Sequence, residues 1–210
     1  MAHEPEADRP DLAEPSSLSA LYADMARRDE PPRPGFSDRL VTGEGPIGAP
    51  LMLVGEQPGE QEDRLGRPFV GPAGRLLDAS LIEAGLERDA VFVTNAVKRF
   101  KFEPQGKRRM HRTPNAGDIA HYRWWLTQEV RLVNPAVIVA LGATALHALL
   151  GKRQTLASLR GTILPWETRK LIATVHPSYL LRLRDPDSRS REQDAFVSDL
   201  RRARLSAAQP

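Results

Sequence analysis

Short apolar runs alternate with amphipathic stretches along most of the chain after residue 50. The short runs have the length of buried strands, whereas apolar positions spaced three or four residues apart indicate helices. Strands are predicted at 51–54, 91–94, 136–141, 162–164 and 171–175, and helices at about 73–84, 116–133, 143–150 and 192–205. This order is typical of an α/β fold, and we expect a three-layer α/β/α arrangement with a central, mostly parallel sheet.

The N-terminal stretch lacks this pattern. Residues 1–38 contain six prolines and scattered charges around one short apolar segment at 18–22, which is a candidate helix. A segment with so little apolar surface has little to bury, so we predict a flexible N-terminal arm at 1–38 and one folded domain at 39–210. The 210 residues are enough for one domain with a sizeable core.

Charge is divided unevenly along the chain. Residues 1–33 hold eight acids against four arginines, so the formal charge of +3 for the whole chain becomes +7 for the remainder. A basic domain favours a polyanionic partner. No apolar stretch has the length of a membrane span, and the acidic, proline-broken start is unlike a signal peptide. We therefore expect a monomeric, cytoplasmic and nucleoid-associated protein without a membrane partner.

Polar side chains follow three of the predicted strands. Glu56 and Gln57 come after the first strand, Asn95 after the second, and His176 after the strand at 171–175. Because ligands of open parallel sheets bind at the carboxyl ends of the strands, these residues predict a site at one sheet edge.

The loop after the first strand is rich in glycine. Five glycines between Gly55 and Gly74 allow sharp turns and close backbone approach, and Phe69 lies among them without helical apolar partners. An aromatic ring on such a loop is suited to stacking on a planar ligand, with packing inside the loop as the alternative.

Three sequence motifs carry a family resemblance. They are Gly-Glu-Gln-Pro-Gly at 55–59 with Arg-Pro-Phe-Val-Gly-Pro-Ala-Gly-Arg-Leu-Leu at 67–77, Lys-Arg-Arg-Met-His-Arg-Thr-Pro at 107–114, and His-Pro-Ser at 176–178. From Gly43 to about Leu205 the chain resembles the uracil-DNA glycosylase superfamily, and the first motif is similar to its family 4 and UdgX branches. The basic motif resembles the loop that distinguishes UdgX from turnover glycosylases.

The resemblance implies a protein that excises uracil from DNA, with single-stranded DNA preferred because a base in a duplex must first be flipped out. Asn95 is suited to reading uracil, since its amide can donate to O4 and accept from N3–H, whereas cytosine reverses both polarities. Phe69 would stack on the base, and Gln57 would contact it together with loop amides. His176 would donate to O2 of the departing base.

The basic stretch 98–112 holds seven Lys or Arg against one acid, which fits a phosphate backbone. Resemblance to UdgX implies that His111 attacks C1′ of the sugar and forms a covalent link, with Glu56 orienting the ring and accepting its proton. Other contacts to DNA are assigned to Lys107, Arg108, Arg109, Arg112 and Ser178. The carboxylates Glu60, Glu62 and Asp63 are interpreted as solvated loop charges.

Other functions remain open from the residues alone. One alternative is a turnover glycosylase, in which His111 contacts phosphate and Glu56 positions a water. Another is a non-catalytic module that holds uracil-containing DNA. A phosphate-cradling nucleotide-binding domain is disfavoured, because the glycine-rich loop lacks the Lys-Ser/Thr of a P-loop and the spacing of a Rossmann fingerprint.

The chain has no cysteine. The resemblance implies a 4Fe–4S cluster, which depends chiefly on Cys thiolates. The segments where the family would place ligands carry Ala26, Asp29, Arg99 and Tyr122 instead. We therefore expect no cluster, metal or other cofactor, and ordinary packing and polar contacts in its place.

Overall fold

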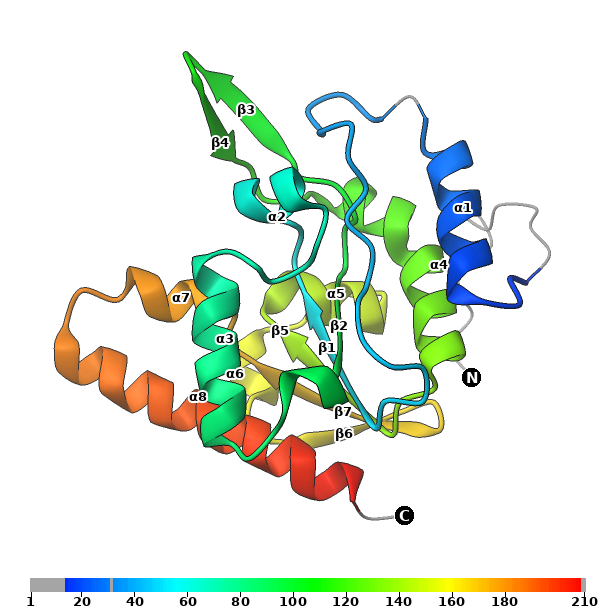
Figure 1. The fold of residues 1–210 in the computed structure, drawn as a ribbon. Coiled ribbons are helices and arrows are strands. Elements are labelled where there is room, and N and C mark those ends of the chain that lie inside the picture. The colour runs from blue at the N-terminus through cyan, green and yellow to red at the C-terminus, as the bar shows by residue number, and fades with distance from the viewer. Residues whose placement is uncertain (1–13, 31, 209–210) are drawn as a thin grey trace.

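The computed structural model describes residues 14–30 and 32–208 and shows a five-stranded sheet between two layers of helices (Figure 1). The strand order is β2-β1-β5-β7-β6. The first four strands in this order are parallel, and β6 runs antiparallel on β7 at one edge. The strands are β1 (Leu51–Gly55), β2 (Phe92–Asn95), β5 (Val137–Leu141), β6 (Ile163–Trp166) and β7 (Arg169–Thr174).

Helices cover both faces of this sheet, so its central strands are buried on both sides. Along β1, Met52 and Val54 join the core under α1, α4 and α5, whereas Leu51 and Leu53 join the core under α3 and α8. This arrangement confirms the expected three-layer α/β/α fold. The helices are α1 (Leu18–Arg28), α2 (Glu60–Leu65), α3 (Pro72–Glu83), α4 (Ala116–Val133), α5 (Ala143–Leu150), α6 (Leu156–Leu159), α7 (Pro177–Arg182) and α8 (Pro186–Ala207), with a 3₁₀ turn, η2, at Arg88–Ala90.

Helix boundaries follow their caps. The Asn115 side chain accepts a hydrogen bond from the Asp118 amide, and Asp118 returns one to the Asn115 amide, which fixes the start of α4. Helix α8 begins earlier than predicted, because Asp185 caps it and Pro186 occupies its first turn.

The N-terminal stretch differs from the expected flexible arm in the part that the structure describes. Helix α1 packs on α4 and buries Leu21 and Met25 completely. The apolar spacing at 18, 21, 22 and 25 continues beyond the short segment noted in the sequence, and this longer stripe explains the docking. Residues 1–13 and 31 lie outside the described residues, and the domain boundary at 38 stays a prediction.

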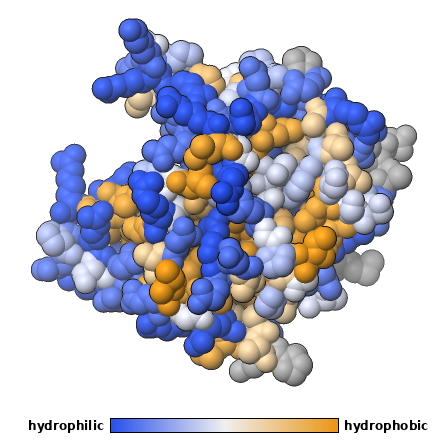
Figure 2. Space-filling model, in the orientation of Figure 1, coloured by the Kyte–Doolittle hydropathy of each residue, from blue (hydrophilic) through white to orange (hydrophobic). Residues whose placement is uncertain are grey.

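A second, two-stranded sheet was not predicted. Strands β3 (Phe102–Gln105) and β4 (Arg108–His111) form an antiparallel hairpin that projects from the body of the molecule (Figure 1). In the same orientation, hydrophilic side chains cover the projection, and the outline is concave between it and the side of the molecule that carries α7 (Figure 2). Among the described helices, none is long and apolar enough to cross a membrane.

Candidate active site

Glu56 lies at the centre of the predicted sheet edge, directly after β1. Its Oε1 is 3.3 Å from Nε2 of His111 at the end of β4, and its Oε2 accepts a 2.6 Å hydrogen bond from the Thr144 hydroxyl. Burial by itself would raise the pKa of the Glu56 carboxyl, but hydrogen bonds from His111 and Thr144 outweigh it and hold the pKa below its usual range. Glu56 is therefore an anion that orients one ring nitrogen of His111.

His111 remains accessible in this arrangement. Its side chain is 49% exposed, while the Phe100 ring lies beside it with centroids 6.2 Å apart. The hairpin thus carries an imidazole from the projection back to the sheet edge, where Glu56 holds it. The sequence motifs predicted both Glu56 and His111, but they did not indicate that His111 lies on a hairpin.

His176 follows β7 and caps α7. Its Nδ1 accepts a hydrogen bond from the Ser178 backbone N–H at 3.2 Å, and the Ser178 Oγ lies 2.8 Å from the same nitrogen. A backbone N–H can only donate, so the neutral ring carries its proton on Nε2. Burial lowers the pKa of His176 to about 4, the Glu56 charge opposes the shift, and Arg182 and His111 add to it. At neutral pH His176 is an uncharged hydrogen-bond donor.

Ser178 therefore has a partner within the protein. We expected it to contact DNA, but its Oγ lies against His176 and accepts a 3.0 Å hydrogen bond from Arg182. These contacts fix the orientation of the His176 ring.

Asn95 is the last residue of β2 and is 3% exposed. Lys98 Nζ donates to its backbone oxygen at 2.7 Å. Its side-chain amide has no hydrogen-bond partner among residues 14–30 and 32–208. This amide is therefore available for a ligand with matching polarity.

Phe69 is buried beside His176, with ring centroids 6.0 Å apart and an interplanar angle of 30°. Its backbone adopts a φ of 55°, which is unusual for an aromatic residue. A Cβ placed on Gly74 would be 1.7 Å from the Phe69 carbonyl oxygen, so the glycine at 74 is required for this conformation. Phe69 packs within its loop and also presents an aromatic ring next to His176 and Asn95.

Gln57 has a different role from the predicted contact to a base. Its Nε2 donates to the backbone oxygens of Lys101 and Arg112, at 3.3 and 3.1 Å, and its Oε1 accepts from the Lys101 amide at 3.1 Å. Lys101 and Arg112 flank the hairpin. The buried Gln57 amide therefore holds its two strands together at the end where they join the body of the molecule. Both amide protons are thereby committed to the protein.

The basic side chains of the hairpin are of two kinds. Lys107 and Arg108 are exposed at its tip, and Arg112 is exposed beside Glu103, with which it pairs. Arg109 instead stacks over the rings of Phe100 and Phe102, each 5.3 Å from its guanidinium carbon, and donates to Asp63 at 2.5 Å. Arg109 thus fastens the hairpin to α2.

The carboxylates of α2 correct another expectation. Glu60 is half-buried, and Glu62 and Asp63 are buried rather than solvated. Glu62 accepts from the Gly71 amide at 3.0 Å, and Asp63 accepts from Ser37 and Arg109.

The sequence analysis did not single out Thr144, which donates to Glu56. Its place two residues beyond Gly142, after β5 and on the same sheet edge, could have indicated it.

Comparisons with known proteins agree with this architecture. The family model of the uracil DNA glycosylase superfamily matches residues 42–201. A type-4 uracil-DNA glycosylase of Thermotoga maritima is 43% identical over 152 residues, which cover 71% of this chain and 76% of that protein. Similar enzymes of Pyrobaculum aerophilum and Sulfurisphaera tokodaii are 35% and 36% identical, covering 79% and 69% of this chain and 85% and 64% of their own lengths.

Proposed function

The chain belongs to the uracil DNA glycosylase superfamily, and on that premise we propose that it excises uracil from DNA and captures the resulting sugar through His111, as in the UdgX branch. The observation that carries the proposal is the contact between Glu56 and His111, at 3.3 Å, on the sheet edge where Asn95 and His176 also lie. A histidine that only contacted phosphate would have no need of a carboxylate within the site.

Recognition depends on Asn95 and Phe69. The unpartnered Asn95 amide donates to O4 of uracil and accepts from N3–H, while the Phe69 ring stacks on the base. Cytosine presents the opposite polarities, so it leaves mismatched groups that cost about 1–3 kcal/mol each. Single-stranded DNA is the preferred substrate, because it avoids the few kcal/mol needed to unstack and unpair a base in a duplex.

Bond cleavage depends on His176. The bond between uracil N1 and the sugar C1′ breaks, and its electron pair moves onto the base. Nε2–H of neutral His176 donates to O2 and stabilises the anion that develops. The Glu56 carboxylate stabilises the positive charge that develops on the sugar.

Capture depends on His111. The protonated ring nitrogen of neutral His111 donates a hydrogen bond to Glu56 without losing its proton, and the other ring nitrogen attacks C1′ with its lone pair. The new N–C1′ bond creates an imidazolium, whose remaining proton passes to Glu56. The product is a neutral alkylated imidazole, which is a poor leaving group, so the protein acts once.

The experiment combines the purified protein with a uracil-containing single strand, followed by boiling in detergent and denaturing electrophoresis. We expect a slow-migrating protein–DNA band from the parent. His111→Ser is expected to give no such band but to release uracil and leave an abasic site, since recognition and cleavage depend on other residues. His147→Ser, which removes an imidazole on α5, is the matched control and retains the band.

Two outcomes contradict the proposal. Free abasic product from the parent without a slow band would identify a turnover glycosylase. Binding that salt reverses, with uracil still attached to the DNA, would identify a non-catalytic module. His176→Ala is expected to slow uracil release itself, which separates its role from that of His111.

A further inference from the structure

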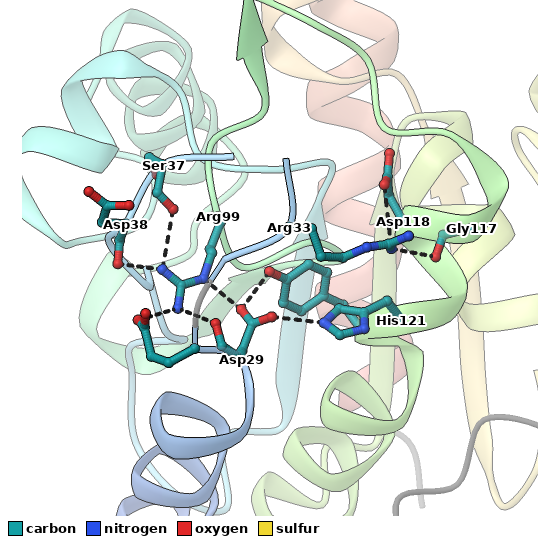
Figure 3. Close-up of polar contacts among 10 residues, drawn as sticks. Asp29, Arg33, Ser37, Asp38, Arg99, Gly117, Asp118 and His121 are labelled. Atoms are coloured by element: carbon teal, nitrogen blue, oxygen red, sulfur yellow. Dashed lines mark hydrogen bonds and ion pairs between the residues drawn. The ribbon is translucent and has the colours of Figure 1, made fainter. Parts of the chain in front are cut away.

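Arg99 lies at the centre of a buried polar network (Figure 3). The side chain is 0% exposed, although it carries a guanidinium group. Nε donates to Asp29 Oδ2 at 2.6 Å, and one terminal nitrogen donates to the Asp29 backbone oxygen at 2.9 Å and to Glu30 at 2.8 Å. The other terminal nitrogen donates to the backbone oxygens of Ser37 and Asp38.

The Asp29 carboxylate completes the network from the other side. Its Oδ2 also accepts a 2.7 Å hydrogen bond from the Tyr122 hydroxyl, and its Oδ1 lies 2.8 Å from Nε2 of His121. Burial alone would raise the pKa of Asp29, but hydrogen bonds from His121, Arg99 and Tyr122 hold it below the usual range. The carboxylate is thus ionised and surrounded by donors.

Three of these residues occupy the positions at which family resemblance implies ligands of an iron–sulfur cluster. Asp29, Arg99 and Tyr122 come from separate parts of the chain, yet they contact one another directly. They do not fit a cluster, because a guanidinium carries no lone pair for iron, and burial raises the pKa of the Tyr122 hydroxyl so that it stays protonated. Across the described residues, no group of three or more His, Asp or Glu side chains is arranged to hold a metal ion.

We infer that the network of Asp29, Arg99 and Tyr122 replaces a metal cross-link with a cross-link of ion pairs and hydrogen bonds. It joins the end of α1, the segment 37–38, the loop after β2 and the helix α4. A metal cluster joins segments by shared coordination, and here one guanidinium and one carboxylate join segments by shared hydrogen bonds.

Arg99 connects this cross-link to the candidate site, because it lies in the segment between Asn95 and the hairpin that carries His111. Arg99 lies four residues after Asn95 and three before the hairpin strand β3. The preceding residue, Lys98, is also fully buried, and it donates to Glu129 of α4 at 2.5 Å. Two consecutive buried cations therefore fasten the segment between the base-reading strand and the hairpin to α1 and α4.

The test measures thermal unfolding, which is independent of any activity on uracil. Arg99→Met removes the charge and all five donors, and leaves Asp29 buried with fewer partners. We expect its melting temperature to fall by about 10 °C. The control is Arg67→Met, because Arg67 makes a two-bond pair with Glu44 that is exposed, and it is expected to change the melting temperature by about 2 °C or less.

A milder variant covers the case in which Arg99→Met does not fold. Tyr122→Phe removes only the hydroxyl that donates to Asp29, and we expect a fall of about 4 °C. Parent protein prepared with an iron chelator is expected to melt at the same temperature as protein prepared with added iron. Stoichiometric iron in the anaerobically purified parent, a lower melting temperature after chelation, or Arg99→Met and Tyr122→Phe variants as stable as the parent would each overturn the inference.

Discussion

Gly55 lies against the side chains of Asn95 and Phe69, the two residues that we propose recognise the base. A Cβ built on this residue would be 2.4 Å from Asn95 Oδ1 and 2.5 Å from Phe69 Cζ. Both distances are shorter than a van der Waals contact, and both neighbours are buried. The glycine therefore sets the separation between the Asn95 amide, which we propose reads uracil, and the Phe69 ring, which we propose stacks on it.

We expect Gly55→Ala to lower the rate of uracil release by at least about 100-fold, because displacing Asn95 loses its paired hydrogen bonds to the base. The measurement is single-turnover release of uracil from single-stranded DNA. Gly117→Ala, at an exposed position early in α4 where the nearest atom would be 3.3 Å away, is the control. Equal rates for Gly55→Ala and the parent would remove Asn95 and Phe69 from the recognition site.

Several site residues were predictable from the sequence because strand ends reveal them. Glu56, Asn95 and His176 each follow a strongly apolar strand, so their convergence required only the parallel order of the sheet. Gln57 and Asp63 were misjudged, since their partners Arg112 and Arg109 are more than 40 residues away in sequence. The local pattern of apolar and polar residues carries no information on hydrogen bonds between residues so far apart in the chain.

At the scale of elements, periodicity and capping decided which predictions succeeded. Helix α4 was predicted within its observed bounds, because Asn115 and Asn134 mark its ends and an apolar stripe joins them. The hairpin of β3 and β4 was missed, since its strands are largely exposed, contain Pro104 and show no apolar alternation. Its structure depends on Gln57, Arg109 and the turn at Gly106, whose φ is 59°.

The Gln57 clamp predicts a separation of capture from cleavage. Gln57→Met keeps a similar volume but removes the hydrogen bonds to Lys101 and Arg112, so the hairpin should hold His111 less firmly against Glu56. We expect the ratio of covalent adduct to free abasic product to fall by about tenfold. This change corresponds to a loss of about 1.4 kcal/mol in the free energy that positions His111 for attack. The measurement is quantitative denaturing electrophoresis after complete uracil release. An unchanged ratio would show that the clamp does not position His111.

At the scale of the whole molecule, buried titratable groups of the site couple folding to pH. The pKa of His176 falls from 6.5 to about 4 in the folded protein, so between these values the unfolded chain binds more protons than the folded one. Stability from this residue is complete above pH 6.5 and is lost as the pH falls toward 4. The lowered pKa of Glu56 acts in the same direction at lower pH.

We expect the parent to lose about 2 kcal/mol more stability than His176→Asn between about pH 7.5 and pH 5. Asparagine still offers an oxygen to cap the Ser178 amide, so the variant removes the titration while keeping the cap. Denaturant unfolding at the two pH values gives the difference. A parent and a variant with the same pH dependence would show that His176 is not shielded from water as the structure indicates.

The most direct test of the account locates the bond between protein and DNA. Parent protein is incubated with a uracil-containing single strand and treated with nuclease. It is then cleaved after glutamate, so that His111 and His121 lie in one peptide following Glu103. Tandem mass spectrometry is expected to place the added deoxyribose on His111. A sugar located on His121 or on any other residue, or an unmodified peptide beside free abasic DNA, would contradict covalent capture by His111.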